Sequence, residues 1–255
     1  MSQVPLLRPA WPAVPGVGAA MSLREGGVSS GPFASLNISL AVGDDPAAVA
    51  ENRARFAAAI GVRAVWPWLV HGADVTRLLS GAPDIAPTPA DGVWTTERGL
   101  ACTVTAADCM PVLFALRDGS AVGAAHAGWR GLAAGVLEAT VQALCDGTGA
   151  KASDLQAWLG PCIGPRLFEV GADVLQGFAQ DPEHTDLPGF VFRPRADGVP
   201  RWLANLPRLA QDRLETIGVT QLSVANTCTV EDASRFFSFR RDAITGRMAA
   251  AIWRD

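Results

Sequence analysis

The spacing of apolar and polar residues along the chain predicts an alternation of short strands and amphipathic helices. Apolar runs bounded by Gly, Asp or Pro are typical of buried strands, whereas apolar residues at intervals of three and four indicate a helix packed on one face. The predicted strands lie at 66–70, 75–79, 100–105, 112–116, 121–125, 158–160 and 222–225. The predicted helices lie at 46–60, after Gly128, at 168–179 and at 207–217.

The first helix has the clearest end signals. Asp45 is placed to cap it, Pro46 suits its first turn, and Gly61 suits its end. The Pro-rich segment 82–90 is predicted to be a loop, residues 181–201 to be irregular, and the tail 236–252 to be a hairpin. Without a repeat or a clear linker, the whole chain, 1–255, is predicted to be a single α/β or α+β domain.

Composition excludes several classes of protein. The net charge is −4 and no cluster of basic residues is long enough to follow a phosphate backbone, so nucleic acid is not an expected partner. No uninterrupted apolar run reaches the roughly 18 residues of a membrane helix, and the Pro-rich start does not resemble a secretory signal. The five cysteines form no CxxC pair, which favours a reducing cytoplasm over a disulfide framework.

Two of the three histidines and one cysteine stand at the ends of predicted strands. They are His71, Cys109 and His126, each within a segment rich in Gly, Asp or Pro. Imidazole and thiolate ligands suit borderline-soft metals, and three protein ligands leave the fourth position that a catalytic zinc requires. If these strand ends converge at one edge of a sheet, the three side chains form a metal site.

The same residues also fit other interpretations. Cys109 is a candidate nucleophile of a hydrolase with a histidine as its base, although a nearby Asp108 would raise the pKa of the thiol. A third hypothesis is a non-catalytic binding module that a metal stabilises, and a lone histidine or buried cysteine is often only structural. His184, in a polar loop, is expected at the surface.

Two sets of arginines are candidates for anion binding. Arg130 stands at a predicted helix start, where backbone N–H groups and a guanidinium favour phosphate, but a surface ion pair explains it equally well. Arg240 and Arg241 are followed by Asp242, and an ion pair is the favoured interpretation of that cluster.

The ordered motifs resemble one family. They cover residues from about 24 to 252, and are Ser35-Leu36-Asn37, Gly43-Asp44-Asp45-Pro46, His71-Gly72-Ala73-Asp74-Val75, Thr105-Ala106-Ala107-Asp108-Cys109-Met110-Pro111-Val112, Gly123-Ala124-Ala125-His126-Ala127-Gly128-Trp129-Arg130-Gly131, Gly160-Pro161-Cys162-Ile163-Gly164-Pro165, Phe168-Glu169-Val170-Gly171 and Phe236-Phe237-Ser238-Phe239-Arg240-Arg241-Asp242. This set closely resembles the YfiH-like family, also called polyphenol oxidase, laccase-domain protein or purine nucleoside phosphorylase.

The resemblance implies a single-domain layered sandwich of mixed β-sheets with outer helices. It implies a metal at His71, Cys109 and His126, usually zinc with copper as the alternative, and substrate binding by Arg130 and Asn37. It also implies phosphorolysis of adenosine, inosine and methylthioadenosine, with adenosine deamination as a second activity. Copper-dependent polyphenol oxidation is the older label of the family that the chain resembles, and a role in editing peptidoglycan precursors is attached to some bacterial members. The oligomeric state stays open between monomer and homodimer.

Two positions depart from the family pattern. Asn205 stands where the family usually has Asp, and Glu231 stands where members often have a second cysteine. A multicopper laccase needs a blue-copper site and a histidine-rich trinuclear cluster. With His71 and His126 in the first site, only His184 remains for the second, so the sequence favours zinc.

Overall fold

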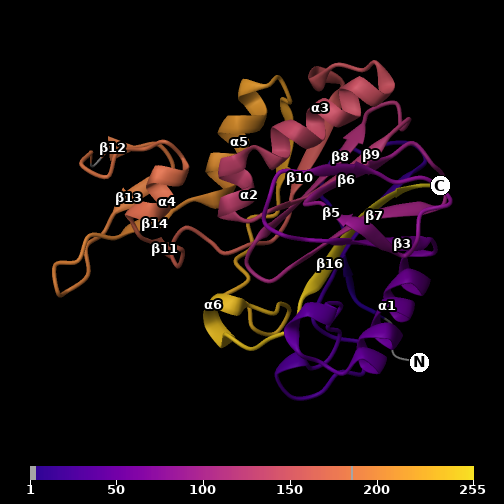
Figure 1. Ribbon diagram of the computed structural model, residues 1–255, viewed down its shortest axis with the longest axis horizontal. Coiled ribbons are helices and arrows are strands. Elements are labelled where there is room, and N and C mark those ends of the chain that lie inside the picture. Colours follow the sequence, from indigo (N-terminus) through magenta and orange to yellow (C-terminus); the bar gives the residue numbers. More distant parts are fainter. Residues whose placement is uncertain (1–3, 185) are drawn as a thin grey trace.

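Two six-stranded mixed sheets face each other in the computed structural model, which describes residues 4–184 and 186–255 (Figure 1). The first sheet has the order β1 (Leu6–Leu7), β2 (Val17–Ser22), β16 (Met248–Arg254), β7 (Leu100–Ala106), β3 (Arg63–Trp68) and β5 (Ile85–Pro89). The second has the order β15 (Gln221–Val224), β10 (Leu155–Leu159), β8 (Met110–Leu116), β9 (Val122–Ala127), β6 (Gly92–Thr95) and β4 (Val75–Arg77).

Apolar residues fill three layers around these sheets. The layer between the sheets includes Val104 and Ile252 from the first sheet and Leu113 and Trp158 from the second. Helix α1 (Pro46–Ile60) covers the outer face of the first sheet. Helices α3 (Val136–Thr148) and α5 (Leu206–Thr216) cover the outer face of the second. The fold is therefore the mixed α/β sandwich with outer helices that was predicted.

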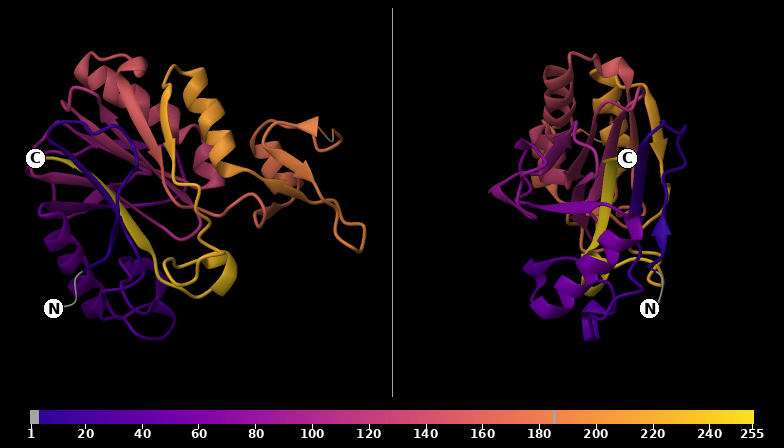
Figure 2. Two further views of the ribbon diagram at one scale, coloured as in Figure 1. Left: turned by 180° about the vertical axis from the view of Figure 1, so that it is seen from behind. Right: turned by 90° about the vertical axis from the view of Figure 1, so that its right-hand side faces the viewer.

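A third, smaller sheet projects from one side of the sandwich (Figures 1 and 2). Its order is β11 (Glu169–Val170), β14 (Trp202–Ala204), β13 (Phe190–Phe192) and β12 (Asp186–Leu187), and α4 (Ala172–Gly177) lies beside it. The region 181–201, predicted to be irregular, therefore contributes strands. Within the described residues, no helix has the length and apolar character needed to cross a membrane.

The local signals at α1 act as predicted. The Asp45 side chain accepts a hydrogen bond from the Ala47 amide, and Pro46 occupies the first turn. Gly61 ends the helix with φ of 76°, a left-handed conformation that glycine adopts without strain. The predicted range 46–60 is confirmed.

Two predictions for non-helical segments are wrong. The loop predicted at 82–90 contains β5, which pairs with β3 as the outermost strand of its sheet. An edge strand tolerates proline because one side of its backbone needs no ladder partner. The predicted hairpin at 236–252 has only its second strand, β16. Its first half turns into α6 (Phe239–Asp242), because the Ser238 hydroxyl accepts a hydrogen bond from the Arg241 amide and caps a helix.

Two predicted helices are interrupted by glycine. The helix after Gly128 is split into α2 (Trp129–Ala134) and α3, because Gly135 takes a φ of 95° between them. The helix predicted at 168–179 starts only after Gly171, and its first residues form β11 instead. Apolar spacing alone does not reveal these breaks, since each glycine lies inside a run with helical periodicity.

Candidate metal centre

His71, Cys109 and His126 come together at one end of the sandwich. Their candidate ligand atoms all lie within 4.8 Å of one another. Sγ of Cys109 is 3.9 Å from Nε2 of His71, and the two imidazole rings meet edge to face with their centroids 4.8 Å apart. His126 is buried, Cys109 is partly exposed and His71 is exposed, so the group has an open side. The structure brings together the three residues that the sequence singled out.

Strand ends and sharp turns deliver these side chains. His71 follows β3, Cys109 directly precedes β8, and His126 lies near the end of β9. In the ladder between β8 and β9, Pro111 pairs with His126, which places Cys109 at the same edge. The turn from β7 to β8 crosses from one sheet to the other. His71 and Asp108 both have left-handed backbones, with φ of 62° and 87°, as tight turns require.

Asp91 is a residue of the candidate centre that the sequence analysis did not single out. It is fully buried, and its Oδ1 lies 2.8 Å from Nδ1 of His126 and accepts the His71 amide at 3.0 Å. Its Oδ2 accepts the amides of Val70 at 3.0 Å and Gly72 at 2.8 Å. One carboxylate therefore acts on both histidines: it holds the backbone of the His71 turn and accepts a hydrogen bond from Nδ1–H of His126, which leaves Nε2 for a metal.

The charges within the group stabilise a thiolate beside an imidazolium. Burial opposes ionisation of Cys109, but the charge and hydrogen bonds of His126 and His71 outweigh it and lower the thiol pKa to about 6. Burial also disfavours a charged His126, yet the Cys109 thiolate and Asp91 raise its pKa to about 9. A thiolate with two imidazoles is the soft donor set that zinc or copper prefers, so these residues fit a metal ion.

Asp108 does not act on Cys109 as the sequence suggested. Its carboxylate accepts hydrogen bonds from the Thr229 hydroxyl at 2.6 Å, the Ser238 hydroxyl at 3.0 Å and the Arg240 amide at 2.6 Å. These partners come from the loops after β15. The pKa of Cys109 is lowered rather than raised because His126 and His71 outweigh burial. Asp108 thus joins these loops to the turn that carries Cys109.

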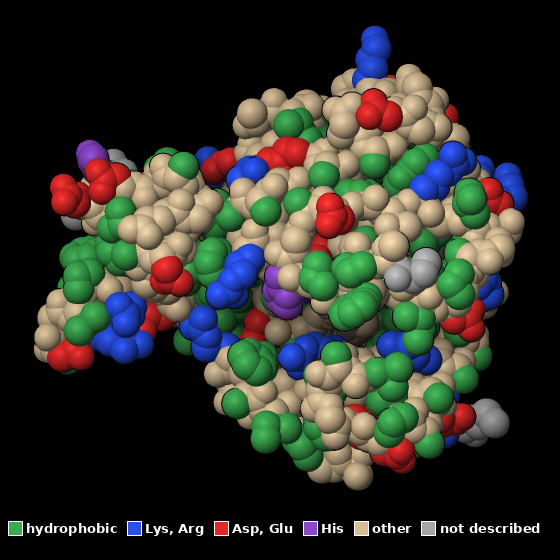
Figure 3. Space-filling model, in the orientation of Figure 1, with side chains coloured by type: hydrophobic (Ala, Val, Ile, Leu, Met, Phe, Trp, Pro, Cys, Tyr) green, Lys and Arg blue, Asp and Glu red, His purple; other side chains and the backbone are tan. Residues whose placement is uncertain are grey.

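Gly128 allows the chain after β9 to pass over the group. An added Cβ at this position would lie 2.8 Å from Sγ of Cys109 and 3.1 Å from Cδ2 of His71. Arg130 follows on α2, exposed, with its guanidinium carbon 4.4 Å from the ring centroid of Trp129. On this face of the molecule, basic side chains gather around a hollow that contains a histidine (Figure 3). Phosphate binding by Arg130 remains a prediction.

Asn37 lies inside the protein, and its side chain already has internal partners. Its Nδ2 donates to Oδ2 of Asp44 at 2.9 Å and to the Ser39 carbonyl at 3.0 Å. Its Oδ1 accepts the amides of Ser39 at 3.0 Å and Arg247 at 2.9 Å. The two donors and the acceptor are all used, so Asn37 positions Arg247 while direct substrate binding by Asn37 remains a prediction.

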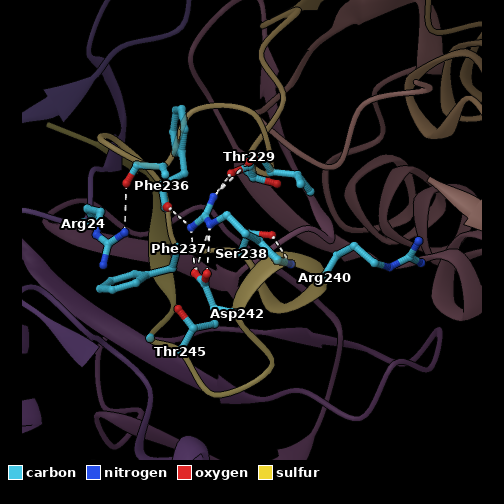
Figure 4. A network of polar contacts seen from close by, with 12 residues as sticks. Arg24, Thr229, Phe236, Phe237, Ser238, Arg240, Asp242 and Thr245 are labelled. Carbon is cyan, nitrogen blue, oxygen red and sulfur yellow. Dashed lines mark hydrogen bonds and ion pairs between the residues drawn. The ribbon is translucent and has the colours of Figure 1, made fainter. Parts of the chain in front are cut away.

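The arginines after Ser238 divide into two roles. Arg241 forms the favoured ion pair with Asp242 at 2.8 Å, and its guanidinium also donates to the carbonyls of Thr229 and Phe236. Figure 4 shows this network, from which the Arg240 side chain extends away. Arg240 donates to the carbonyls of Leu167 and Glu169 in the projecting region.

The remaining histidine and the other cysteines lie outside the group of three ligands. His184 is exposed in its loop, 3.3 Å from an Asp181 oxygen. Cys102 and Cys162 are buried, and burial raises the pKa of both thiols, so neither is a ready nucleophile. Cys145 is partly buried on α3. The backbones of Cys228 and Cys162 pair in an isolated parallel β-bridge, and both thiols are free.

Comparison with known proteins decides the family. The family model described as multi-copper polyphenol oxidoreductase laccase matches residues 18–255. The chain belongs to this family. The laccase description does not fit the histidine count for a trinuclear copper cluster, because the third histidine of the sequence lies in the Asp181 loop.

Relatives of this laccase family are similar along nearly the full chain. A purine nucleoside phosphorylase of Pseudomonas aeruginosa is 45% identical over 252 residues, covering 97% of both chains. Purine nucleoside phosphorylase YfiH of Escherichia coli is 45% identical over 251 residues, covering 97% of this chain and 98% of its own. The crystal structure of YlmD from Geobacillus stearothermophilus superposes with a TM-score of 0.88 at 34% identity, covering 100% of this chain and 97% of the other.

The Asn205 departure from the family pattern has a structural role. Asn205 caps α5, since its Oδ1 accepts the Arg208 amide at 3.0 Å, and Asp would serve the same role. Asn205 also lines a cavity of about 270 Å³ together with Cys162 and Cys228. None of the three candidate metal ligands lines that cavity, so it is separate from the candidate metal centre.

Proposed function

We propose that this protein is a metal-dependent purine nucleoside phosphorylase whose centre is His71, Cys109 and His126. The observation that carries the proposal is the convergence of these three ligand side chains around an open side, with Asp91 behind them. Full-length similarity to relatives named purine nucleoside phosphorylase supports the reaction.

The reaction exchanges one bond at the sugar for another. An oxygen of phosphate forms a bond to C1′ of the ribose while the bond from C1′ to the purine nitrogen breaks. The electron pair of that bond leaves with the purine, which takes up the proton that the phosphate loses, and the sugar becomes ribose 1-phosphate. Much of the rate in such a reaction comes from holding phosphate and nucleoside in line.

The protein's own residues prepare the site for these reactants. Asp91 orients the ring of His126 through Nδ1 and holds the backbone of the turn that carries His71. Gly128 keeps the approach to Cys109 and His71 open. A metal bound by the three ligands would supply Lewis acidity near the substrate.

The identity of the metal is inferred from the three ligand side chains, and the substrates are inferred from the family resemblance. We propose zinc as the metal, since zinc binds imidazole and thiolate ligands and three protein ligands leave the fourth position open. We propose adenosine, inosine and methylthioadenosine as nucleosides, phosphate as co-substrate and adenosine deamination as a second activity. Copper is the alternative metal for the same donors.

The test is phosphate-dependent release of hypoxanthine from inosine by purified protein. We expect release that requires phosphate and that falls to background in His126→Ala, with elemental analysis giving about one metal per chain in the wild type. Release that is equal in wild type and His126→Ala would contradict the proposal.

The lowered pKa of Cys109 favours a second candidate function. A thiolate at neutral pH beside two histidines is also the arrangement of a cysteine nucleophile, as in a hydrolase or an amidase acting on a cell-wall precursor. This candidate predicts full activity without metal and a covalent adduct on Cys109. Loss of activity on chelation, restored by zinc, would reject it.

A further inference from the structure

Arg247 is a partly buried arginine that the sequence did not single out. It precedes β16, beside the Asn37 segment, and its guanidinium carbon lies 5.7 Å from the ring centroid of Phe239, the first residue of α6. Cys109 and Asp108 are the negative groups whose charge reaches it, although burial has the larger effect and lowers its pKa. Met248, the next residue, pairs with Ala106 of β7, so Arg247 lies beside the turn from β7 to β8 that carries Asp108 and Cys109.

No carboxylate neutralises this guanidinium among the residues that the structure describes. Many exposed arginines have one, such as Arg241 with Asp242 at 2.8 Å and Arg166 with Glu231 at 2.8 Å. Nη1 of Arg247 donates only to the carbonyls of Thr245 and Gly246, at 3.0 Å each. Burying a charge without a partner is unfavourable, so an arginine kept this way suggests an anionic ligand.

The backbone around Arg247 is held firmly. Its amide donates to Oδ1 of Asn37 at 2.9 Å, and its carbonyl accepts the Ile38 amide at 3.1 Å. Asn37 is in turn fixed by Asp44, whose Oδ2 also accepts the Ser29 hydroxyl at 2.6 Å. A guanidinium that is positioned before the ligand arrives loses less entropy on binding than a mobile surface side chain does.

We propose that Arg247 holds the phosphate of the reaction against the metal centre, with Asn37 as its positioning residue. The inference rests on the proposed phosphorylase function and names the anion-binding group within it. A guanidinium suits phosphate because it donates two parallel hydrogen bonds to two oxygens. The exposed Phe239 ring below it adds an apolar wall beside the anion. Arg130, the residue predicted from the sequence, lacks this burial and is stacked on Trp129 instead.

The first experiment separates the two substrates in steady-state kinetics of the zinc-loaded protein. We expect Arg247→Met to raise the KM for phosphate about tenfold to hundredfold, the usual effect of losing hydrogen bonds to a charged group. The KM for inosine should stay within about twofold of wild type. Arg247→Lys keeps the charge but not the paired donors, so its KM for phosphate should lie between those of wild type and Arg247→Met.

The matched control is Arg117→Met. Arg117 follows the far end of β8, about 26 Å from Cys109 at strand spacing, and donates to the carbonyls of Ser153 and Asp154. It should leave both KM values unchanged. Zinc content and melting temperature show whether Arg247→Met has kept its fold. If it has not, the KM for phosphate of Arg247→Lys tests the inference instead.

Equilibrium dialysis of labelled inorganic phosphate against the zinc-loaded proteins tests the inference without turnover. We expect wild type and Arg117→Met to bind phosphate and Arg247→Met to lose that binding. Equal binding by wild type and Arg247→Met, or loss in Arg130→Met alone, would overturn the inference. If wild type binds phosphate through Arg247 but releases no hypoxanthine, the phosphorylase proposal fails while the anion site stands.

Discussion

At the scale of single residues, Asp91 has the widest effect on the candidate centre. It is fully buried and contacts both histidines, one through a side chain and one through a backbone amide. Burial opposes its charge, but hydrogen bonds from His126 and the Gly72 amide outweigh that effect and lower its pKa. Asp91 therefore shapes the candidate metal centre through two of its three ligand residues.

Asp91→Asn should weaken metal binding by about tenfold to hundredfold, the usual effect of losing a carboxylate behind a ligating histidine. The amide group of Asn would turn a donor toward the amides of Val70 and Gly72, which need an acceptor. Competition with a chromophoric chelator measures the affinity. Asp84→Asn is the control, since Asp84 is exposed and paired with Arg63. Equal affinity in both variants would contradict this role of Asp91.

Metal binding should depend on pH in a direction set by Cys109 and His126. The ligands bind a metal as thiolate and neutral imidazole. Because the pKa of His126 is raised to about 9 by Cys109 and Asp91 against the effect of burial, zinc must displace its proton at neutral pH. Because the His126 charge lowers the Cys109 pKa to about 6 against burial, the thiolate persists down to that pH.

We therefore expect zinc addition at pH 7 to release close to one proton per chain, seen with an indicator in weak buffer. Zinc affinity should rise from pH 7 toward 9 and fall more steeply below about 6, where Cys109 also takes up a proton. Cys109→Ser should remove the steeper fall of zinc affinity below about pH 6, because serine has no thiol to take up a proton there. Proton release of zero at pH 7 would contradict the imidazolium at His126.

At the scale of elements, the chain after β9 must pass close to the ligands. Gly128→Ala should lower metal content, because the new Cβ would lie 2.8 Å from Sγ of Cys109 and force the turn or the ligand to move. Elemental analysis measures this change. Gly81→Ala is the control, since nothing lies within 4 Å of its added Cβ. Full metal content in Gly128→Ala would show that the turn adjusts without cost to the site.

The elements that could be predicted from the sequence are those whose signals are local. Asp45, Pro46 and Gly61 mark both ends of α1 within a few residues of the apolar pattern. The apolar pattern fails where contacts with a distant segment determine the secondary structure. The segment β5 is a strand because it pairs with β3. The turn into α6 depends on the Ser238 cap and on the hydrogen bond from Ser238 to Asp108. The range 168–179 failed because Gly171 separates a strand from a helix.

The candidate centre shows the same division. His71, Cys109 and His126 could be found because rare residue types stand at strand ends. Asp91 could not, since an Asp-Gly pair before a strand is an ordinary turn signal and only the folded chain brings it to His126. Arg247 was missed for a similar reason: its environment is made by residues far away in sequence, Asn37 and Cys109.

At the scale of the whole molecule, the three ligands join parts of both sheets. His71 follows β3 of the first sheet, whereas Cys109 and His126 belong to the edge formed by β8 and β9 of the second. A metal that binds all three in the folded protein, and few of them together in the unfolded chain, stabilises the fold through its binding free energy. At a free concentration 1,000 times its dissociation constant, this effect is about 4 kcal/mol.

We therefore expect a chelator to lower the melting temperature of the wild-type protein, and zinc to restore it. For a chain of this size, a change of about 4 kcal/mol corresponds to a shift of about 8–16 °C, since each 1 kcal/mol moves the midpoint by about 2–4 °C. Cys109→Ser, which lacks the thiolate, should melt near the chelated wild type and respond little to zinc. Scanning calorimetry with and without zinc distinguishes these cases. If zinc raises the melting temperature of Cys109→Ser as much as that of wild type, the stabilising metal binds elsewhere. If zinc restores the stability of the chelated wild type but no phosphorolysis is measured, the protein is a metal-stabilised binding module rather than an enzyme.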